Sequence, residues 1–407
     1  MVNNDSLENK IEAEGIIVGS DYHGNYALIE KAFQTARDDN LIYVLNGDVV
    51  NDYRFKELAD EMGLKTPYQI QTEYFNTHLD KKDLQTMGIT NAIKQYGLEE
   101  VISQFQIPEN KRAEFEKNLS SIIEYSNSED FKNNVQSVYE QMIQEKGNEI
   151  NINAFNLQVL YKVFMDEEAK RFAEEMEKYP EVKVLFNKGN HENQYFVETV
   201  KKYLNEGKNR IIDLSDYENH YSIKNSSNEE LTLLGITNCS QHMPYLHEIF
   251  SPEDLQELYQ HTMTEKKYSG EVDVLVTHGQ IGKPMGLEKA FEVPYLKSAK
   301  DISERAKLII EGHIHNKYDG KNEFGKDMLR AAGEEGVIIK KLEGKITKEW
   351  IKLGDNYEGG HNNPALYDVN TYRIKLQNEI EEIMKKQSQT ANDEKYENSS
   401  DEQSKAA

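Results

Sequence analysis

The chain has one cysteine, no long apolar run and fewer basic than acidic residues. The single cysteine, Cys239, excludes an internal disulfide framework and suits a reducing compartment, so we expect a cytoplasmic protein. No apolar run approaches the roughly 20 residues that a membrane-spanning helix needs. The polar start of the chain also carries no signal-peptide core. We therefore expect no membrane partner.

Acidic residues outnumber basic residues by 72 to 48, which gives a formal net charge of -24. Nucleic-acid binding depends largely on Lys and Arg side chains that neutralise phosphates. Because the sequence contains no basic run long enough for that purpose, we expect no nucleic-acid partner. A length of 407 residues with 29% charged residues predicts two or three domains, with much exposed helix or a disordered segment.

Five short apolar runs each end in a cluster of polar residues that bind metals well. Glycines accompany every cluster and permit sharp turns with a close approach of the backbone. The last cluster, with its Gly-His-x-His sequence, is the most distinctive. The clusters are Asp21-Tyr22-His23-Gly24-Asn25, Asn46-Gly47-Asp48, Lys188-Gly189-Asn190-His191-Glu192, His278-Gly279 and Glu311-Gly312-His313-Ile314-His315.

The apolar runs predict buried strands of an α/β core. A strand at 14–20, a helix at 26–39 and a strand at 41–45 form a β-α-β unit, which implies parallel strands. Further strands are expected at 182–187, 211–214, 231–236, 272–277 and 308–310, with a closing hairpin at 336–341 and 345–353.

About 140 residues separate the second cluster from the third, far more than one crossover needs. Apolar residues at helical spacing near 98–105, 113–125 and 131–144 predict a helical insertion, and a core helix is expected at 155–178. The insertion fits a substrate-selecting cap, a partner or oligomer surface, or filler. The predicted parts are a core at 1–53, the insertion at 54–154, a second core part at 155–373, and a short helix at 375–386 with a disordered acidic tail within 374–407.

The clusters supply nitrogen and oxygen ligands without a thiolate, which suits Mn, Fe, Zn or Co. In an open parallel sheet, ligands gather outside the carboxyl ends of the strands, so distant clusters can meet. Seven ligands are too many for one ion but suit two ions if one carboxylate bridges them. The predicted ligands are Asp21, His23, Asp48, Asn190, His278, His313 and His315.

The order Asp-x-His, Gly-Asp, Gly-Asn-His-Glu, His-Gly and Gly-His-x-His resembles the calcineurin-like metallophosphoesterase superfamily. The resemblance covers about 1–53 and 155–353. It implies an α/β sandwich of mixed β-sheets flanked by helices, here with an inserted helical subdomain. It also implies a hydrolase that needs two divalent metal ions, with Mn, Fe or Zn expected.

The resemblance further implies a role for each cluster. One ion would be held by Asp21, His23, Asp48 and His315, and the other by Asp48, Asn190, His278 and His313. A metal-bridging hydroxide would attack phosphorus, and His191 would protonate the leaving group as general acid.

The expected substrate is a phosphomonoester, protein or small molecule. Asn190-His191-Glu192 partly resembles the phosphoprotein phosphatase and diadenosine tetraphosphatase branch, although Asp52 stands where that branch has a phosphate-gripping Arg. The alternatives are a phosphodiesterase or nucleotide pyrophosphohydrolase, and a non-catalytic metal-bound interaction module. The predicted substrate contacts are Lys188, Asn51, Tyr22 and His242.

Overall fold

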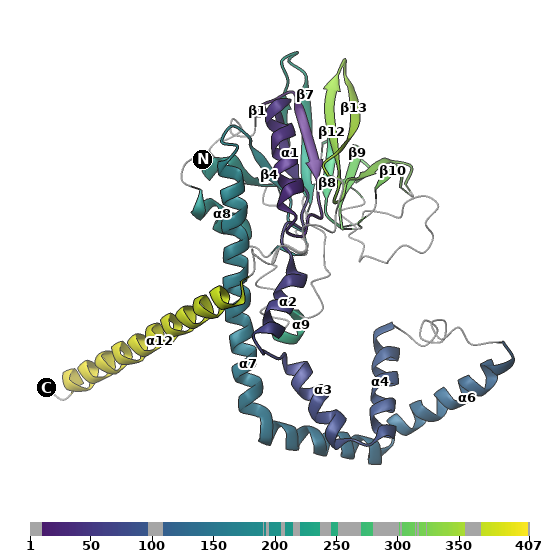
Figure 1. Cartoon of the computed structure of the whole chain (residues 1–407), viewed down its shortest axis with the longest axis vertical. Helices are drawn as coiled ribbons and strands as arrows, with labels where there is room; N and C mark the ends of the chain where they lie inside the picture. Colours follow the sequence, from purple (N-terminus) through teal and green to yellow (C-terminus); the bar gives the residue numbers. More distant parts are fainter. Residues whose placement is uncertain are drawn as a thin grey trace. The chain divides into compact units, whose positions relative to one another are not determined.

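The computed structural model describes most of the chain (Figure 1). The predicted helix near 98–105, the predicted ligand Asn190 and the predicted substrate contact His242 lie outside the described residues. The described residues are 10–96, 109–189, 191–192, 195–204, 208–214, 220–236, 246–250, 270–279, 301, 303–313, 315, 317–322, 324–354 and 368–405.

The chain divides into two compact units, Met1–Met62 with Gln158–Ala407, and Gly63–Leu157. The second unit overlaps the predicted insertion at 54–154, but residues 54–62 belong to the first unit. They form most of α2 (Asp52–Glu61). The ring of Phe55 lies 5.2 Å from that of Tyr161 and 5.6 Å from that of Phe164, which ties this helix to the first unit.

The larger sheet of the first unit has seven strands of mixed direction. Its centre is parallel, because β8 pairs in parallel with both β7 and β9. The pairs β6–β7 and β10–β11 are antiparallel, and the edge strand β1 pairs in parallel with β6. The order is β1 (Lys10–Glu12), β6 (Tyr221–Lys224), β7 (Glu230–Ile236), β8 (Val272–Thr277), β9 (Ala306–Glu311), β11 (Asp327–Arg330) and β10 (Tyr318–Lys321).

The smaller sheet has six strands and contains the predicted β-α-β unit, since β2 and β3 pair in parallel and α1 connects them. The predicted closing hairpin is confirmed by the antiparallel pairing of β12 with β13. The order is β13 (Lys345–Lys352), β12 (Glu335–Leu342), β2 (Gly15–Gly19), β3 (Leu41–Leu45), β4 (Val184–Phe186) and β5 (Ile211–Asp213).

The two sheets share one apolar core. Val18 and Val44 of the smaller sheet belong to the same buried cluster as Val274 and Ile310 of the larger sheet. This packing confirms the predicted sandwich of mixed sheets. Helix α1 (Tyr26–Asp38) flanks the smaller sheet, and the ring of its Phe33 lies 5.1 Å from that of Tyr43 on β3. The remaining short elements of this unit are α8 (Phe196–Tyr203), the 3-10 helix η1 (Lys208–Arg210) and α9 (Leu246–Ile249).

One 49-residue helix, α7 (Glu129–Glu177), replaces the two helices expected at 131–144 and 155–178. The prediction of a break was wrong because Gly147 and the polar residues after it remain helical. A glycine inside a helix costs only about 1 kcal/mol relative to alanine. In the first unit, α7 buries Phe164 and Phe172.

The second unit is helical, as expected for an insertion. Its described helices are α3 (Pro67–His78), α4 (Lys81–Tyr96), α6 (Glu109–Ser126) and the first part of α7. Tyr74 and Phe75 of α3 pack with Val138 and Met142 of α7 in one buried cluster. The buried carboxylate of Asp83 accepts a hydrogen bond of 2.9 Å from the Tyr125 hydroxyl, which ties α4 to α6.

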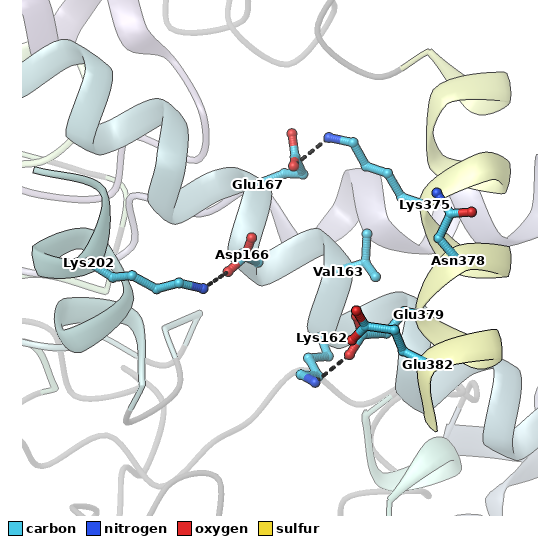
Figure 2. A pocket seen from close by; sticks show the side chains of 9 residues that line it. All are labelled: Lys162, Val163, Asp166, Glu167, Lys202, Lys375, Asn378, Glu379 and Glu382. Atoms are coloured by element: carbon cyan, nitrogen blue, oxygen red, sulfur yellow. Dashed lines mark hydrogen bonds and ion pairs between the residues drawn. The ribbon is translucent and has the colours of Figure 1, made fainter. Parts of the chain in front are cut away.

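Helix α12 (Val369–Lys405) differs from the predicted short helix and disordered tail, since it is helical over 37 residues. The segment contains neither Gly nor Pro, so no residue in it breaks a helix. Figure 2 shows how α12 lies beside α7: Lys162 pairs with Glu379 at 2.6 Å, and Lys375 pairs with Glu167, around a cavity of about 430 Å³. Within the described part of the chain, no helix is long and apolar enough to cross a membrane.

Candidate metal centre

The predicted ligands and the predicted general acid, His191, follow strands of both sheets. Asp21 follows β2, Asp48 follows β3 and His191 follows β4 in the smaller sheet, while His278 follows β8 and His313 follows β9 in the larger sheet. We expected them at the edge of one open parallel sheet, but the strands that they follow belong to two sheets. The clusters meet because the carboxyl ends of both parallel segments converge at one end of the sandwich.

The structure brings six of the seven predicted ligands together with His191. Their donor atoms form three overlapping groups, and within each group the atoms lie within 4.8 Å of one another. His23 and Asp48 each belong to two groups, so the groups form a continuous row. The groups are Asp21, His23 and His315; His23, Asp48 and His191; and Asp48, His278 and His313.

Asp48 occupies the middle of this row. Its Oδ2 atom lies 3.0 Å from His278 Nε2, 3.7 Å from His191 Nε2 and 4.0 Å from His23 Nε2. At one end of the row, His315 Nε2 lies 2.9 Å from His23 Nε2 and 3.6 Å from Asp21 Oδ1. One carboxylate therefore faces donors on both sides, as a bridging ligand must.

Four of these residues have a backbone conformation that is uncommon outside glycine. The φ angles are 58° at Asp21, 44° at His23, 57° at Asp48 and 65° at His313. Hydrogen bonds hold the turns: His23 N–H donates to Asp48 O at 2.8 Å, and His313 N–H donates to Asp21 Oδ2 at 3.1 Å. Strained conformations that the surrounding structure enforces are typical of functional sites.

Glycines allow the ligands to pack this closely. A Cβ atom on Gly47, whose φ is +81°, would lie 2.5 Å from His278 Nδ1. A Cβ atom on Gly189 would lie 2.2 Å from Asp48 Oδ1. Both positions therefore exclude any larger residue, and the sequence prediction that these glycines permit close approach agrees with the structure.

Glu192 holds two ligand loops together, a role that the sequence reasoning missed. Its buried carboxylate accepts hydrogen bonds from the N–H groups of Asp48 (3.0 Å), Val49 (2.6 Å), Val50 (3.1 Å) and Gly189 (3.0 Å). Burial, followed by the charge of Asp48, raises the pKa of Glu192 to about 7. The Gly-Asn-His-Glu pattern contained this residue, but no local signal shows that three of its four partners are backbone groups 142 to 144 residues away.

Burial and neighbouring charges shift the pKa values of the cluster in opposite directions. Burial would raise the pKa of Asp48, but the imidazoles of His191 and His278 hold it well below its usual value. Asp48 has the opposite effect on His278. Burial would lower the pKa of His278, but Asp48 raises it to about 10. At the ends of the row, burial raises the pKa of Asp21 to about 7 and lowers that of His313 to about 4.

The donor set fits divalent metal ions. Every donor is a carboxylate oxygen or an imidazole nitrogen, which suits borderline transition ions. The buried row also concentrates titratable groups that a bound cation would deprotonate. The central carboxylate and the two flanking groups match the two ligand sets implied by the sequence, apart from Asn190, which lies outside the described residues.

Two of the predicted substrate contacts have other partners in the structure. The ammonium of Lys188 lies 2.6 Å from Asp213 Oδ2, and both side chains are buried. Asn51 is the N-cap of α2, and its Oδ1 atom accepts a hydrogen bond of 3.2 Å from Arg54 N–H. These contacts position the backbone next to the cluster. Neither contact was visible in the sequence, because the pairing of Lys188 spans 25 residues and the capping of Asn51 depends on where α2 begins.

Tyr22, the third predicted substrate contact, is fully buried. Its ring folds back over Gly19, where a Cβ atom would lie 1.9 Å from the Tyr22 hydroxyl. Burial raises the pKa of the Tyr22 phenol, and the neighbouring Tyr43 hydroxyl opposes this shift. The position fits the packing of the strand layer better than a pocket wall. Among the described residues, Tyr53 is an aromatic side chain that does lie beside the cluster, and the sequence analysis did not single it out.

Comparison with known proteins agrees with the resemblance seen in the sequence. Residues 161–317 match the family model described as calcineurin-like phosphoesterase, the family that the sequence motifs resemble. The matched range contains His191, His278, His313 and His315, whereas Asp21, His23 and Asp48 join the site through the structure. The core of this chain is thus similar to a metal-dependent phosphoesterase.

Two solved structures give weaker likenesses. One, described only as a crystal structure, has a TM-score of 0.39 and 9% identity, and the match covers 84% of this chain and 100% of that chain. The crystal structure of the 5'-nucleotidase from Candida albicans SC5314 has a TM-score of 0.22 and 12% identity, with 50% of this chain and 43% of that chain covered. At these scores neither likeness bears on fold or function. Among curated proteins, none matches the sequence.

Proposed function

We propose that the protein is a dinuclear metal-dependent phosphoesterase that hydrolyses phosphomonoesters, with phosphoprotein as one candidate substrate. The observation that carries the proposal is the place of Asp48 between two donor groups. Asp21, His23 and His315 lie on one side, and His278 and His313 lie on the other. A single carboxylate shared by two donor groups is what a two-ion site requires.

Mn, Fe or Zn ions bound there would neutralise the phosphate oxygens and make water nucleophilic near neutral pH. Asp21, His23, Asp48 and His315 would hold one ion, and Asp48, His278 and His313, together with Asn190, would hold the other. The buried glycine turns keep these donors in place before the substrate arrives.

His191 is the residue we assign to proton transfer. Its Nε2 atom lies 3.7 Å from Asp48 Oδ2, and its ring lies 4.5 Å from that of His23, so it reaches the centre of the row. Burial lowers the pKa of His191, which favours the neutral ring in the free protein. The negative charge of a bound phosphate favours the protonated ring again, and this form can donate a proton to the leaving oxygen.

Turnover and metal content measured on one preparation test the proposal. With added Mn²⁺, p-nitrophenyl phosphate should be hydrolysed faster than bis(p-nitrophenyl) phosphate, and two ions should bind per chain. Asp48→Ala should lose bound metal and turnover, whereas Asp38→Ala, which removes an exposed aspartate at the end of α1, should keep both.

Three results would contradict the proposal in different ways. Faster turnover of the diester or of a nucleoside pyrophosphate would favour a phosphodiesterase or nucleotide pyrophosphohydrolase. Two bound ions without any turnover would favour a metal-bound interaction module. Loss of metal in His191→Ala, instead of loss of turnover alone, would make His191 a ligand rather than the proton donor. A panel of phosphopeptides tests the candidate protein substrate.

A further inference from the structure

Tyr53 is an exposed aromatic side chain beside a buried site. It lies in the first turn of α2, and 53% of it is exposed. Its ring centroid lies 5.8 Å from that of His191 and 6.1 Å from that of His23, at angles of 50° and 61° between the ring planes. His23 and His191 are themselves buried. Tyr53 therefore stands on the solvent side of these two histidines.

Two described polar residues close to Tyr53 in the sequence, Asn51 and Arg54, have partners of their own. Asn51 caps the helix with its side chain. The Arg54 guanidinium pairs with Glu57 at 2.6 Å and with Glu61 at 3.2 Å. Tyr53 thus offers an aromatic surface next to His23 and His191.

We propose that Tyr53 determines specificity by receiving an aryl leaving group, so that the preferred substrates are aryl phosphomonoesters. The proposal rests on the proposed function. If His191 protonates the leaving oxygen, that oxygen lies beside the His191 ring, and the group bonded to it lies within reach of Tyr53. Aromatic rings attract one another at centroid distances of about 4.5–7 Å. Because the Tyr53 and His191 rings lie 5.8 Å apart, a substrate ring bonded to an oxygen beside His191 would lie within this distance of Tyr53.

The reaction is an ordinary hydrolysis. Water supplies the new P–O bond, the P–O bond to the aryl oxygen breaks, and that oxygen takes a proton from His191, which water later restores. The products are phosphate and a phenol. Tyr53 takes no part in these bond changes. It contributes only contact with the aryl ring, which an alkyl ester cannot match.

Three proteins and two esters test the proposal: wild type, Tyr53→Phe and Tyr53→Leu, each with phenyl phosphate and n-butyl phosphate. Tyr53→Leu should lower kcat/KM for phenyl phosphate about two- to tenfold, the usual value of one aromatic pair. For butyl phosphate the change should stay below about twofold, and Tyr53→Phe should retain wild-type values. Tyr68→Leu removes a similarly exposed tyrosine from the other compact unit and serves as the matched control.

Two outcomes of the ester assays would overturn the assignment. An equal fall for both esters would give Tyr53 a structural role, and an equal loss in Tyr53→Phe would assign the effect to the hydroxyl group. Binding of phenylphosphonate and butylphosphonate, measured by calorimetry, separates this proposal from the proposed function. If no ester is hydrolysed but phenylphosphonate binding still weakens about two- to tenfold in Tyr53→Leu, the proposed function fails and the aryl contact stands. If the phosphonates do not distinguish the variants, the aryl contact fails.

Discussion

Glu192 links the two loops that carry Asp48 and His191, and four backbone N–H groups depend on its carboxylate. Glu192→Ala leaves these buried donors without an acceptor, so we expect the free energy of unfolding to fall by about 3 kcal/mol. Glu192→Gln should lose less, because its amide oxygen still accepts. Urea unfolding measures both changes. Glu198→Ala on α8, where the side chain is exposed, should change stability by less than about 0.5 kcal/mol, and an equal effect there would refute the role of Glu192.

The contribution of Asp273 to the stability of the fold should depend on pH. Its buried carboxylate accepts from Lys307 at 2.8 Å, from Lys341 at 2.8 Å and from Thr232 N–H at 3.1 Å. Burial would raise the pKa of Asp273, but these partners lower it below its usual value. The unfolded state thus binds more protons, so the stabilisation is complete above the unfolded pKa of about 3.9 and is lost as pH falls through the lower folded pKa.

Asp273→Asn should therefore destabilise the protein at pH 7 by about 1–2 kcal/mol, a modest value because Lys307 is half exposed. The difference from wild type should shrink at about pH 3. Chemical unfolding of both proteins at the two pH values checks this. A difference that does not change with pH would show that shape, rather than charge, makes Asp273 important.

The candidate metal ligands could be located from the sequence because each one closely follows a buried apolar run. The contacts of Lys188, Tyr22 and Glu192 could not. The Asp213 partner of Lys188 lies on another strand, Tyr22 folds back over Gly19, and Glu192 binds backbone groups that any sequence would contain. Residue type indicated the chemistry of the site, whereas the direction of each side chain depended on strand pairing.

Helix α7 shows why the boundaries of helices were harder to predict than their existence. Gly147 and the asparagines after it favour a break, but packing of the helix on both sides of this point outweighs that preference. A Cβ atom at Gly147 would meet only Ile143 Cγ2, at an ordinary 3.8 Å.

Gly147→Ala should therefore stabilise the protein by about 0.5–1 kcal/mol, because alanine loses less backbone entropy in a helix. Gly47→Ala should do the opposite, since φ is +81° and the new Cβ atom would collide with His278. Thermal unfolding of the two variants measures both effects. A lower melting temperature for Gly147→Ala would indicate that α7 is bent or broken at this residue in solution.

The strands, the first crossover and the closing hairpin were predictable because they are local patterns, whereas the sandwich was expected from the family resemblance. The convergence of two sheets at the site was not predictable, because a strand sequence does not specify its sheet. Helix α12 was also not predictable over its full length. Its polar composition resembles that of a disordered tail, although the segment contains no helix-breaking residue.

For the molecule as a whole, metal binding should increase the free energy of unfolding. An ion that binds only the folded chain at 100 times its Kd adds about 2.7 kcal/mol to the free energy of unfolding. Mn²⁺ should therefore raise the melting temperature of the wild-type protein, and EDTA should reverse the rise. Asp48→Ala should respond little to either reagent. A rise in Asp48→Ala equal to that of wild type would place the binding ions elsewhere.

The carboxylate of Glu192 also makes the centre of the site more rigid than its end. Asp48 and Gly189 are fixed to the same acceptor, so the centre of the row has little freedom to shift. His315, by contrast, is 40% exposed and lies at the end of the row. If the row binds two ions as proposed, we expect His315 to move more than Asp48 when ions of different radius bind, because Asp48 is the more firmly held of the two.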